Sequence, residues 1–322
     1  MPNYKKISNN IHQVIIDNPK TVKEKLIWIN IKNAGKKEIE FLRKKFNFRL
    51  SHLQASSVKT TAQRPIIEQA EEYLFMILHF PVFENGKIIS GEIDFFIGPG
   101  FLITLHDNNI KELNDFFNLY KKDGDSHLGY EFESSSLLLY ELLEKLILSC
   151  HALLDQNSLA INEIEKLIFA NQQKKAVSKI LTLRLGITIF RKIMQNHKNI
   201  IKKLMVRESR FATPETIKKH YVQLIEHSKR LWENLENQKE SIDILNNTNE
   251  SLLNYKISDI MKTLTIFSVI VFPLTLFAAV FGMNTTGGMP FLDTENGFWV
   301  IISFMLLGCL GMIIFFSKKK WL

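Results

Sequence analysis

Residues 263–284 read TLTIFSVIVFPLTLFAAVFGMN, and residues 297–322 read GFWVIISFMLLGCLGMIIFFSKKKWL. No charged side chain occurs from Thr263 to Leu292, and none from Gly297 to Ser317. A helix rises about 1.5 Å per residue, so about 20 apolar residues cross a hydrocarbon core of about 30 Å. Core helices of soluble proteins rarely run so long without a charge. We therefore expect two transmembrane helices, over residues 263–283 and 297–317.

The lysines around the two spans predict their orientation. The loop 284–296 contains no Lys or Arg, whereas Lys256 and Lys262 precede the first span. Because basic residues favour the cytoplasmic side, both termini are expected in the cytoplasm and only the loop outside. The chain then ends in a basic cytoplasmic tail, residues 318–322, which contains Lys318, Lys319 and Lys320.

One face of the first span mixes small, hydroxyl, thioether and aromatic side chains at steps of three and four residues. It carries no ionisable group, although a proton relay or a site for a dehydrated ion usually needs one. Ordinary helix packing explains such a face as well as a pore lining does. Pro273 lies in the middle of this span and removes one backbone hydrogen bond. The face consists of Ser258, Met261, Leu264, Ser268, Phe272, Thr275 and Ala279.

The first 132 residues predict an α+β or α/β domain with a mixed sheet. A helical spacing of apolar residues covers 36–46. The dipeptide Asn85-Gly86 is the strongest hairpin signal in the chain and joins two of the expected strands. Those strands cover residues 12–17, 25–31, 73–83, 87–96 and 101–105.

Residues 133–212 have few helix-breaking residues and are expected to form a hairpin of helices. Ser134, Ser135 and Ser136 can cap a helix that runs over 137–169. A second long helix is expected over 178–206.

Residues 213–262 predict a stalk helix that continues into the membrane. Thr213-Pro214-Glu215 has the order of a helix start: N-cap, proline and acid in the first turn. No Pro or Gly follows until Pro273, so one helix of about 100 Å is expected from about Thr216 across the membrane. Such a helix needs partners along its apolar stripe, either the preceding helices or other copies. The stripe consists of Leu224, Ser228, Leu231, Leu235, Ile242, Leu245 and Leu252.

Composition excludes several other classes. The formal net charge is +8, but the lysines are scattered and no basic-aromatic nucleic-acid motif occurs, so nucleic-acid binding is not expected. The two cysteines, Cys150 and Cys309, are far apart in apolar helical contexts and indicate neither a disulfide nor a metal site. The N-terminus lacks an apolar signal segment. No ATP-binding motif is present, and an enzyme is not expected.

Several short motifs resemble the CorA family of divalent-cation channels. The Gly-Met-Asn triplet at the end of the first of two C-terminal spans is the most specific of them, because of its position and its flanks. The matching segments are 260–266, 272–275, Gly282-Met283-Asn284, Met289-Pro290 and the KKKWL ending, with Gln63-Arg64-Pro65 and Phe95–Gly98 upstream.

This resemblance implies a homopentameric funnel in a bacterial inner membrane, with an α/β/α cytoplasmic domain. The first span would line a central pore, with Gly282, Met283 and Asn284 as the selectivity filter. Met261 and Leu264 fall at the family's cytoplasmic hydrophobic constriction, and Thr275 at a polar pore position. Two acids of the outer loop, Asp293 and Glu295, would concentrate cations at the mouth or serve as ordinary solvated side chains.

The resemblance also implies transport of hydrated Mg²⁺, with Co²⁺ and Ni²⁺, into the cytoplasm. Divalent ions, membrane lipid and further copies of the chain are the expected partners. No cofactor is expected, because Mg²⁺ is the transported ion. Alternatives are a Zn²⁺ transporter of the ZntB type, against which Met283 argues, and a membrane-tethered sensor or scaffold.

Three positions depart from the family pattern. Phe291 replaces the acid of the usual Met-Pro-Glu-Leu loop. Ser56-Ser57 stands where many members carry a Glu-Asp pair, and Asn247 stands where the stalk often carries an acid. These departures suggest gating without the usual inhibitory Mg²⁺ bridge, or with Glu250 and Asp243 in its place.

Overall fold

The computed structural model of the chain describes residues 3–17, 25–57, 65–122, 134–208, 214–284, 290–291 and 295–321. The chain forms two compact units, Met1–Asn246 and Asn247–Leu322. In chain order the elements are β1 (Asn3–Lys6), β2 (Ile11–Asp17), β3 (Lys25–Lys32), α1 (Lys36–Phe46), α2 (Leu50–Ala55), β4 (Ile66–Gln69), β5 (Leu74–Glu84), β6 (Lys87–Gly98), β7 (Phe101–His106), α3 (Lys111–Lys122), α4 (Ser135–Phe169), α5 (Gln173–Met194), α6 (His197–Glu208), α7 (Pro214–Phe281) and α8 (Gly297–Lys318).

The first unit is built on a seven-stranded mixed sheet in the order β1-β2-β3-β7-β6-β5-β4. β3 and β7 are parallel, with Trp28 opposite Leu102, and every other neighbouring pair is antiparallel. At the tip of the β5–β6 hairpin, Asn85 and Gly86 have φ values of 50° and 77°. Positive φ at both positions belongs to the type I′ turn, which confirms the predicted hairpin.

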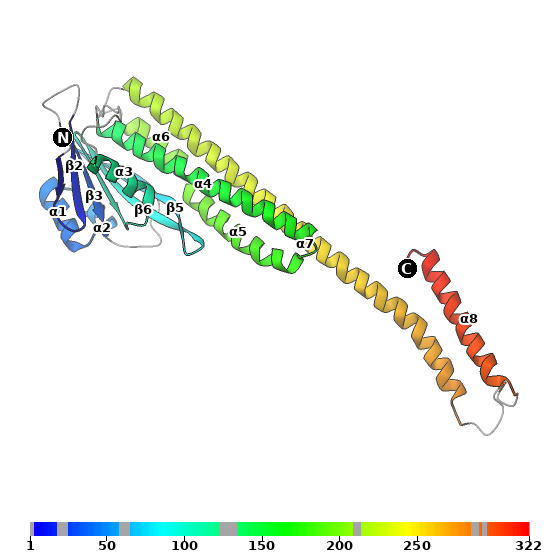
Figure 1. Ribbon diagram of the computed structural model, residues 1–322. Helices are drawn as coiled ribbons and strands as arrows, with labels where there is room; N and C mark the ends of the chain where they lie inside the picture. The colour runs from blue at the N-terminus through cyan, green and yellow to red at the C-terminus, as the bar shows by residue number, and fades with distance from the viewer. Residues whose placement is uncertain are drawn as a thin grey trace. The chain divides into compact units, whose positions relative to one another are not determined.

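Each face of the sheet carries its own core, because side chains of a strand alternate between faces. Phe75 and Ile77 point toward α1 and α2. Leu74 and Met76 of the same strand belong to the core shared with α3, α4, α5, α6 and α7. The result is the expected α/β/α arrangement, with α1 and α2 on one side of the sheet and α3 and α4 on the other (Figure 1).

The five predicted strands are confirmed as β2, β3, β5, β6 and β7, with ends within about two residues. Two short strands, β1 and β4, and two helices, α2 and α3, were not predicted. The helix α3 carried a usable signal, since Leu113, Phe116, Phe117 and Tyr120 follow helical spacing and pack into the core.

The second predicted hairpin helix, over 178–206, is wrong as a single helix. α4 begins as expected, with the Ser134 hydroxyl accepting a hydrogen bond from the Leu137 N–H. The next helix breaks at Gln195–Asn196 into α5 and α6. No Pro or Gly marks the break. It occurs where His197 is buried against Phe80 of the sheet, so tertiary packing redirects the chain.

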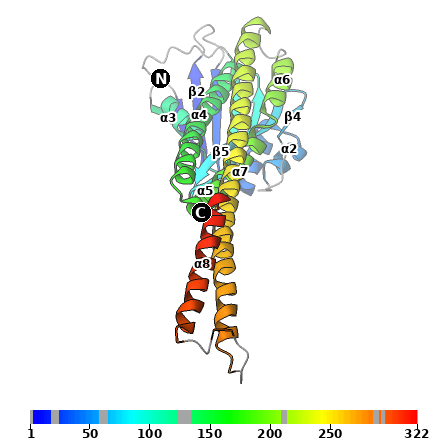
Figure 2. The ribbon, with the colours of Figure 1, turned by 90° about the vertical axis from the view of Figure 1, so that its right-hand side faces the viewer.

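The stalk prediction is confirmed, since α7 is one helix of 68 residues that crosses Pro273 without interruption. It starts at Pro214, about two residues before the predicted start. Thr213, the predicted N-cap, lies outside the described residues. In the first unit, Tyr221, Leu224, Leu231 and Leu235 of α7 are fully buried in the core shared with α4. Figure 2 shows α4 and α7 running along the sheet.

His197 is a buried polar group whose ring packs edge-on against Phe80. Its side chain is 0% exposed, and neither ring nitrogen has a hydrogen-bond partner in the described part of the chain. Burial lowers the pKa of His197 from 6.5 to about 4, because the charged form cannot be hydrated there.

We predict that His197→Leu stabilises the first unit by about 1 kcal/mol at pH 7, since an unmade buried hydrogen bond is removed. The unfolded chain binds a proton at His197 below pH 6.5, while the folded chain does so only below about 4. Stability of the natural protein therefore falls between these values, by about 2 kcal/mol at pH 5. Urea midpoints at pH 7 and 5, followed by circular dichroism, should show a smaller difference for the variant. A lower midpoint at pH 7 with an unchanged pH dependence would contradict this account.

Candidate ion-conduction site

The Gly-Met-Asn triplet directly follows the last turn of α7. The Gly282 N–H donates to the carbonyl oxygen of Ala278 at 2.9 Å, and the Met283 N–H donates to that of Val280 at 3.3 Å. A Cβ at Gly282 would lie 3.0 Å from the Ala278 oxygen, a backbone atom that cannot easily move. Glycine therefore allows the chain to leave the helix here. Asn284 follows in an exposed, irregular backbone.

All seven predicted pore-lining residues lie on α7, in the second unit. Three of them are large side chains that stay exposed within this chain: Met261 at 56%, Leu264 at 56% and Phe272 at 71%. Ser258, Thr275 and Ala279 are also exposed, and Ser268 is half-buried. A single chain thus leaves this face uncovered.

The opposite face of α7 packs toward α8. Ile266 is buried, and an almost wholly apolar cavity of about 560 Å³ lies between the two helices. On the α7 side this cavity is lined by Pro273, Leu274, Phe277 and Phe281. At about 100° per residue, these positions lie about half a turn from the predicted pore-lining face. Figure 2 shows the two helices side by side.

Two hydroxyl groups on this face of α7 donate hydrogen bonds to backbone carbonyl oxygens of their own helix. Ser268 donates to the carbonyl oxygen of Leu264 at 2.9 Å, and Thr275 donates to that of Val271 at 2.9 Å. A hydroxyl whose proton is taken still has oxygen lone pairs free. Both side chains therefore present acceptors, which suit the hydrogens of water around a cation.

The basic tail is folded back onto the end of α8. The Trp321 N–H donates to the Phe316 carbonyl and the Lys320 N–H to that of Ser317, the pattern of a Schellman cap with Lys320 at φ 55°. The Trp321 ring stacks on Phe316 at 5.9 Å between centroids. The Lys262 ammonium of α7 donates to the Lys320 carbonyl oxygen at 3.2 Å.

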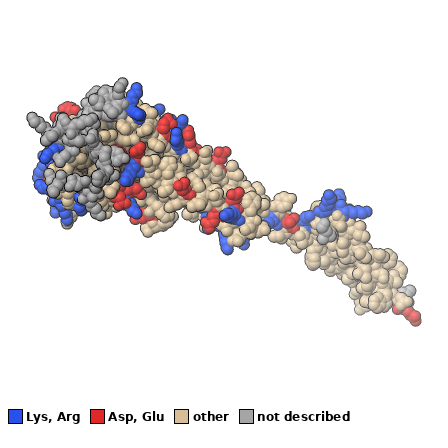
Figure 3. Space-filling view, turned by 45° about the horizontal axis from the view of Figure 1, so that its top comes forward, with Lys and Arg blue, Asp and Glu red and all other residues tan. Residues whose placement is uncertain are grey.

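Charge among the described residues of the second unit is confined to its ends. The lysines share one end with Glu250 and Asp259, Glu295 lies at the other end, and Figure 3 shows uncharged surface between the ends on this face. The described lysines at the first end include Lys262, Lys318, Lys319 and Lys320. Of the two predicted loop acids, Glu295 is exposed, and Asp293 lies outside the described residues.

Two ion pairs link α5 to α7 in the first unit, and they were not predicted from the sequence. Arg184 Nε lies 3.0 Å from the Asp243 carboxylate, and Arg191 Nε donates to Glu236 at 2.8 Å. The Arg191 guanidinium also lies over the Trp232 ring at 5.4 Å. The two arginines are seven positions apart on α5, and the two acids are seven positions apart on α7. The sequence shows this spacing, but which arginine pairs with which acid depends on how the two helices pack.

Of the positions discussed as departures from the family pattern, Ser57 and Asn247 are neutral. The suggested substitute Asp243 already forms ion pairs. The Ser57 hydroxyl donates to the Gln54 carbonyl at 2.9 Å, and Asn247 is exposed on α7. Asp243 lies 3.0 Å from Arg184 and 3.6 Å from Lys239, so binding a cation would require it to exchange these partners.

Comparison with known proteins finds a matching family model and several similar proteins. The family model described as "CorA-like Mg2+ transporter protein" matches residues 23–320. A "Cobalt/magnesium transport protein CorA" of Methanocaldococcus jannaschii is 24% identical over 299 residues, 92% of each chain. A protein of the same description from Thermotoga maritima is 22% identical over 298 residues, 92% of this chain and 83% of the relative. The solved "complete structure of CorA magnesium transporter" of M. jannaschii has a TM-score of 0.81 at 23% identity, covers 92% of each chain and shows the same fold.

Proposed function

Because this chain belongs to the CorA-like Mg²⁺ transporter family, we propose that it forms an oligomeric channel for hydrated divalent cations, Mg²⁺ above all and also Co²⁺ and Ni²⁺. The family consists of membrane transporters and not of enzymes. The C-terminal part of α7 and the helix α8 are the membrane-spanning helices.

The observation that carries this proposal is the division of the α7 span into two faces. One face lines the cavity shared with α8, and the face that leads to Gly282, Met283 and Asn284 points away from α8 and is exposed within a single chain, as most of the span is. Two spans per chain cannot enclose a pore, so several copies must combine around the exposed face. The number five comes from the family resemblance.

The groups on this face suit an ion that keeps its water shell. Mg²⁺ gives up water reluctantly, and its bound waters are hydrogen-bond donors. The Asn284 amide oxygen and the hydroxyl oxygens of Ser268 and Thr275 would accept from that shell rather than replace it. A fixed carboxylate at the filter would hold the ion too tightly for release.

The membrane potential supplies the driving force. It contributes about 2.3 kcal/mol per charge per 100 mV, hence about 4.6 kcal/mol for a divalent ion that enters a negative interior. We infer that the protein lies in a bacterial inner membrane with both termini in the cytoplasm. The lysines at one end of the spans and the lysine-free outer loop support this orientation.

The test is ion uptake into proteoliposomes that contain the full chain. We expect uptake of Mg²⁺, Co²⁺ and Ni²⁺ that rises with an inside-negative potential and does not respond to a proton gradient. Zn²⁺ uptake that depends on a proton gradient would favour a zinc transporter instead. No uptake of any of these ions would favour a membrane-tethered scaffold.

A further inference from the structure

The cavity between α7 and α8 in the second unit is large and apolar. Its volume of about 560 Å³ is several times the roughly 150 Å³ of an engineered apolar cavity that stays dry and binds benzene. Every side chain that lines it is apolar, including Leu274, Phe277 and Phe281 of α7. The cavity therefore suits an apolar ligand that is larger than a single small ring.

The cavity is elongated along the helix axes. Its lining residues on α8 recur at steps of three and four, so most of them share one face of the helix. That face extends over about 16 Å, at about 1.5 Å per residue. Membrane-spanning helices lie on average about 20° from the bilayer normal, which is also the mean direction of lipid acyl chains. The lining residues of α8 are Ile301, Phe304, Met305, Leu307, Gly308 and Met312.

Gly308 leaves the middle of this face open. A Cβ at Gly308 would have no atom within 4 Å apart from its immediate neighbours and the backbone of its own helix. Met305 and Met312 lie on the neighbouring turns of the same face. Flexible thioether side chains adapt to irregular occupants. The middle of the cavity thus combines free space with an adaptable wall.

Phe291 lines the cavity at its end near the loop, with a strained backbone. Its φ is 71°, in the left-handed region that bulky residues rarely adopt. Such strain persists only where the surrounding structure holds it, and it often marks a functional position. The side chain is 46% exposed and adds an aromatic surface to the apolar lining.

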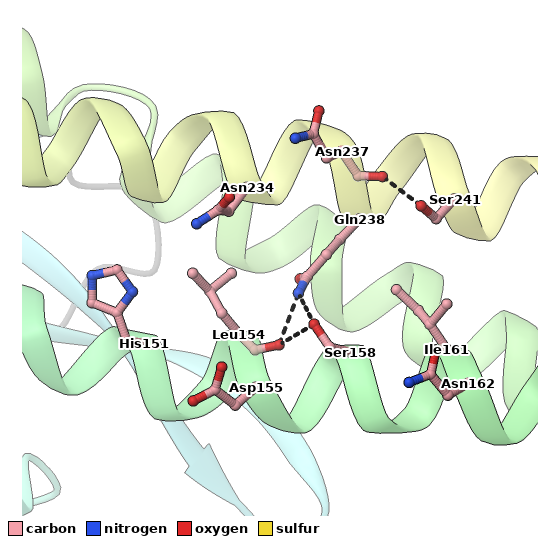
Figure 4. Close-up of a pocket in the computed structure, with 10 residues that line it drawn as sticks. All are labelled: His151, Leu154, Asp155, Ser158, Ile161, Asn162, Asn234, Asn237, Gln238 and Ser241. Atoms are coloured by element: carbon pink, nitrogen blue, oxygen red, sulfur yellow. Dashed lines mark hydrogen bonds between the residues drawn. The ribbon is translucent and has the colours of Figure 1, made fainter.

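Water does not suit this cavity, because a buried water needs about two to four polar partners. The polar groove between α4 and α7 shows the contrast. There the Gln238 amide nitrogen donates to the Leu154 carbonyl at 2.8 Å and to Ser158 Oγ at 3.0 Å (Figure 4). The side chains around the α7–α8 cavity offer no such groups, and the hydrocarbon core of a membrane supplies no water. Its occupant must be as apolar as the lining.

Other copies of the chain are needed on the opposite side of α7. The proposed pore-lining face, with Phe272 and Ala279, lies about half a turn from Phe277 and Phe281 of the cavity. Copies that pack around the pore-lining face leave the side toward α8 to the surrounding lipid. This assignment of sides follows from the proposed function. Lipid retention is measured without transport, so failure of the proposed pore and failure of a lipid site can be told apart.

We propose that this cavity binds one acyl chain of a phospholipid from the leaflet on the side of the loop 284–296. The chain would lie along Gly308, between the facing sides of the two helices, with the headgroup beyond Phe291. It would fill space that neither helix fills and so hold α7 and α8 at a fixed spacing. No lining residue is charged, so the acyl chain is recognised and the headgroup is not.

The test is native mass spectrometry of the full-length protein, reconstituted in vesicles of one phospholipid and then extracted in mild detergent. The probes are dipalmitoylphosphatidylcholine, dipalmitoylphosphatidylglycerol and dihexanoylphosphatidylcholine. We expect both long-chain lipids to be retained, at about one per chain, because each chain forms one such cavity. The short-chain lipid should be lost. Retention of the anionic lipid alone would assign the lipid to the lysines at the other end of the spans and would overturn the proposal.

Matched variants test the cavity itself. Gly308→Leu fills its middle and should abolish lipid retention. Gly311→Leu is the control, because Gly311 is also a glycine of α8 with open space at its Cβ position but lies outside the lining. The same spectra report whether each variant assembles. The proposal is overturned if Gly308→Leu retains as much lipid as Gly311→Leu, or if the short-chain lipid is retained equally well.

Photolabelling of the natural protein needs no variant. A phosphatidylcholine with a diazirine on its acyl chain is irradiated after bulk lipid has been removed by detergent. We expect adducts on Phe277 and Met305, which line the cavity, and none on Leu310, which is 54% exposed on α8 outside it. Adducts on Leu310 without adducts on Met305 would place the lipid on the outer surface of α8 and refute the proposal.

Discussion

Proteoliposomes that contain the Asn284→Ala variant should take up Mg²⁺ about 10- to 100-fold more slowly than those with the natural protein. Hydrogen bonds to charged groups contribute about 1.5–3 kcal/mol, which corresponds to about 10- to 100-fold in rate. Asn284 follows the last turn of α7 with its side chain exposed, so the substitution removes an acceptor without disturbing a packed core. Initial uptake rates measured with a fluorescent Mg²⁺ indicator inside the vesicles provide the measurement.

Two further variants separate the role of the amide from that of shape. Asn284→Asp keeps the size but adds a charge, and we expect a lower half-saturating Mg²⁺ concentration together with slower maximal uptake, because the ion leaves more slowly. Asn296→Ala is the matched control. Asn296 is an exposed asparagine at the other end of the same loop, and its side chain makes no cap hydrogen bond. Uptake by Asn284→Ala above half of the natural rate would refute the filter assignment.

Replacing Leu264 by Asn should have the opposite effect and increase basal uptake about tenfold. Leu264 and Met261 lie at neighbouring turns of the exposed α7 face, near the proposed cytoplasmic end of the span. Apolar rings in a narrow pore hold back water and ions, and removing about 1.4 kcal/mol of that barrier corresponds to about tenfold in rate. Uptake without an imposed potential is the measurement, since a constriction limits flux even when the driving force is small.

Leu310→Asn is the control for this substitution. Leu310 is 54% exposed and Leu264 56%, and both are leucines within a span, but Leu310 lies on α8. We expect Leu310→Asn to leave uptake unchanged. If Leu310→Asn and Leu264→Asn accelerate uptake equally, the effect comes from a polar side chain in the bilayer, and α7 does not line the constriction.

Much of this protein was predictable because its signals are local. Two charge-free runs, each of at least 20 residues, predict membrane-spanning helices. The hairpin at Asn85-Gly86 follows from two residues that tolerate positive φ. The continuity of α7 follows from the absence of Pro and Gly between Pro214 and Pro273. In each case the residues of one short segment are enough to predict its conformation.

Other features depended on partners that are distant in sequence. The break between α5 and α6 has no Pro or Gly, and His197 is buried there against Phe80, more than a hundred positions away. The ion pairs of Arg184 and Arg191 with α7 required the hairpin to fold back in one register.

The sequence by itself determined the two spans and the stalk, and it predicted their orientation and the Gly282-Met283-Asn284 candidate filter, because hydrophobic length, charge bias and short motifs act within one segment. Only the tertiary structure decided which face of α7 lies toward α8 and which points away from it. It also decided that Asp243 pairs with Arg184 and that Glu236 pairs with Arg191. Those contacts join residues far apart in the chain, and their geometry follows from how whole helices pack.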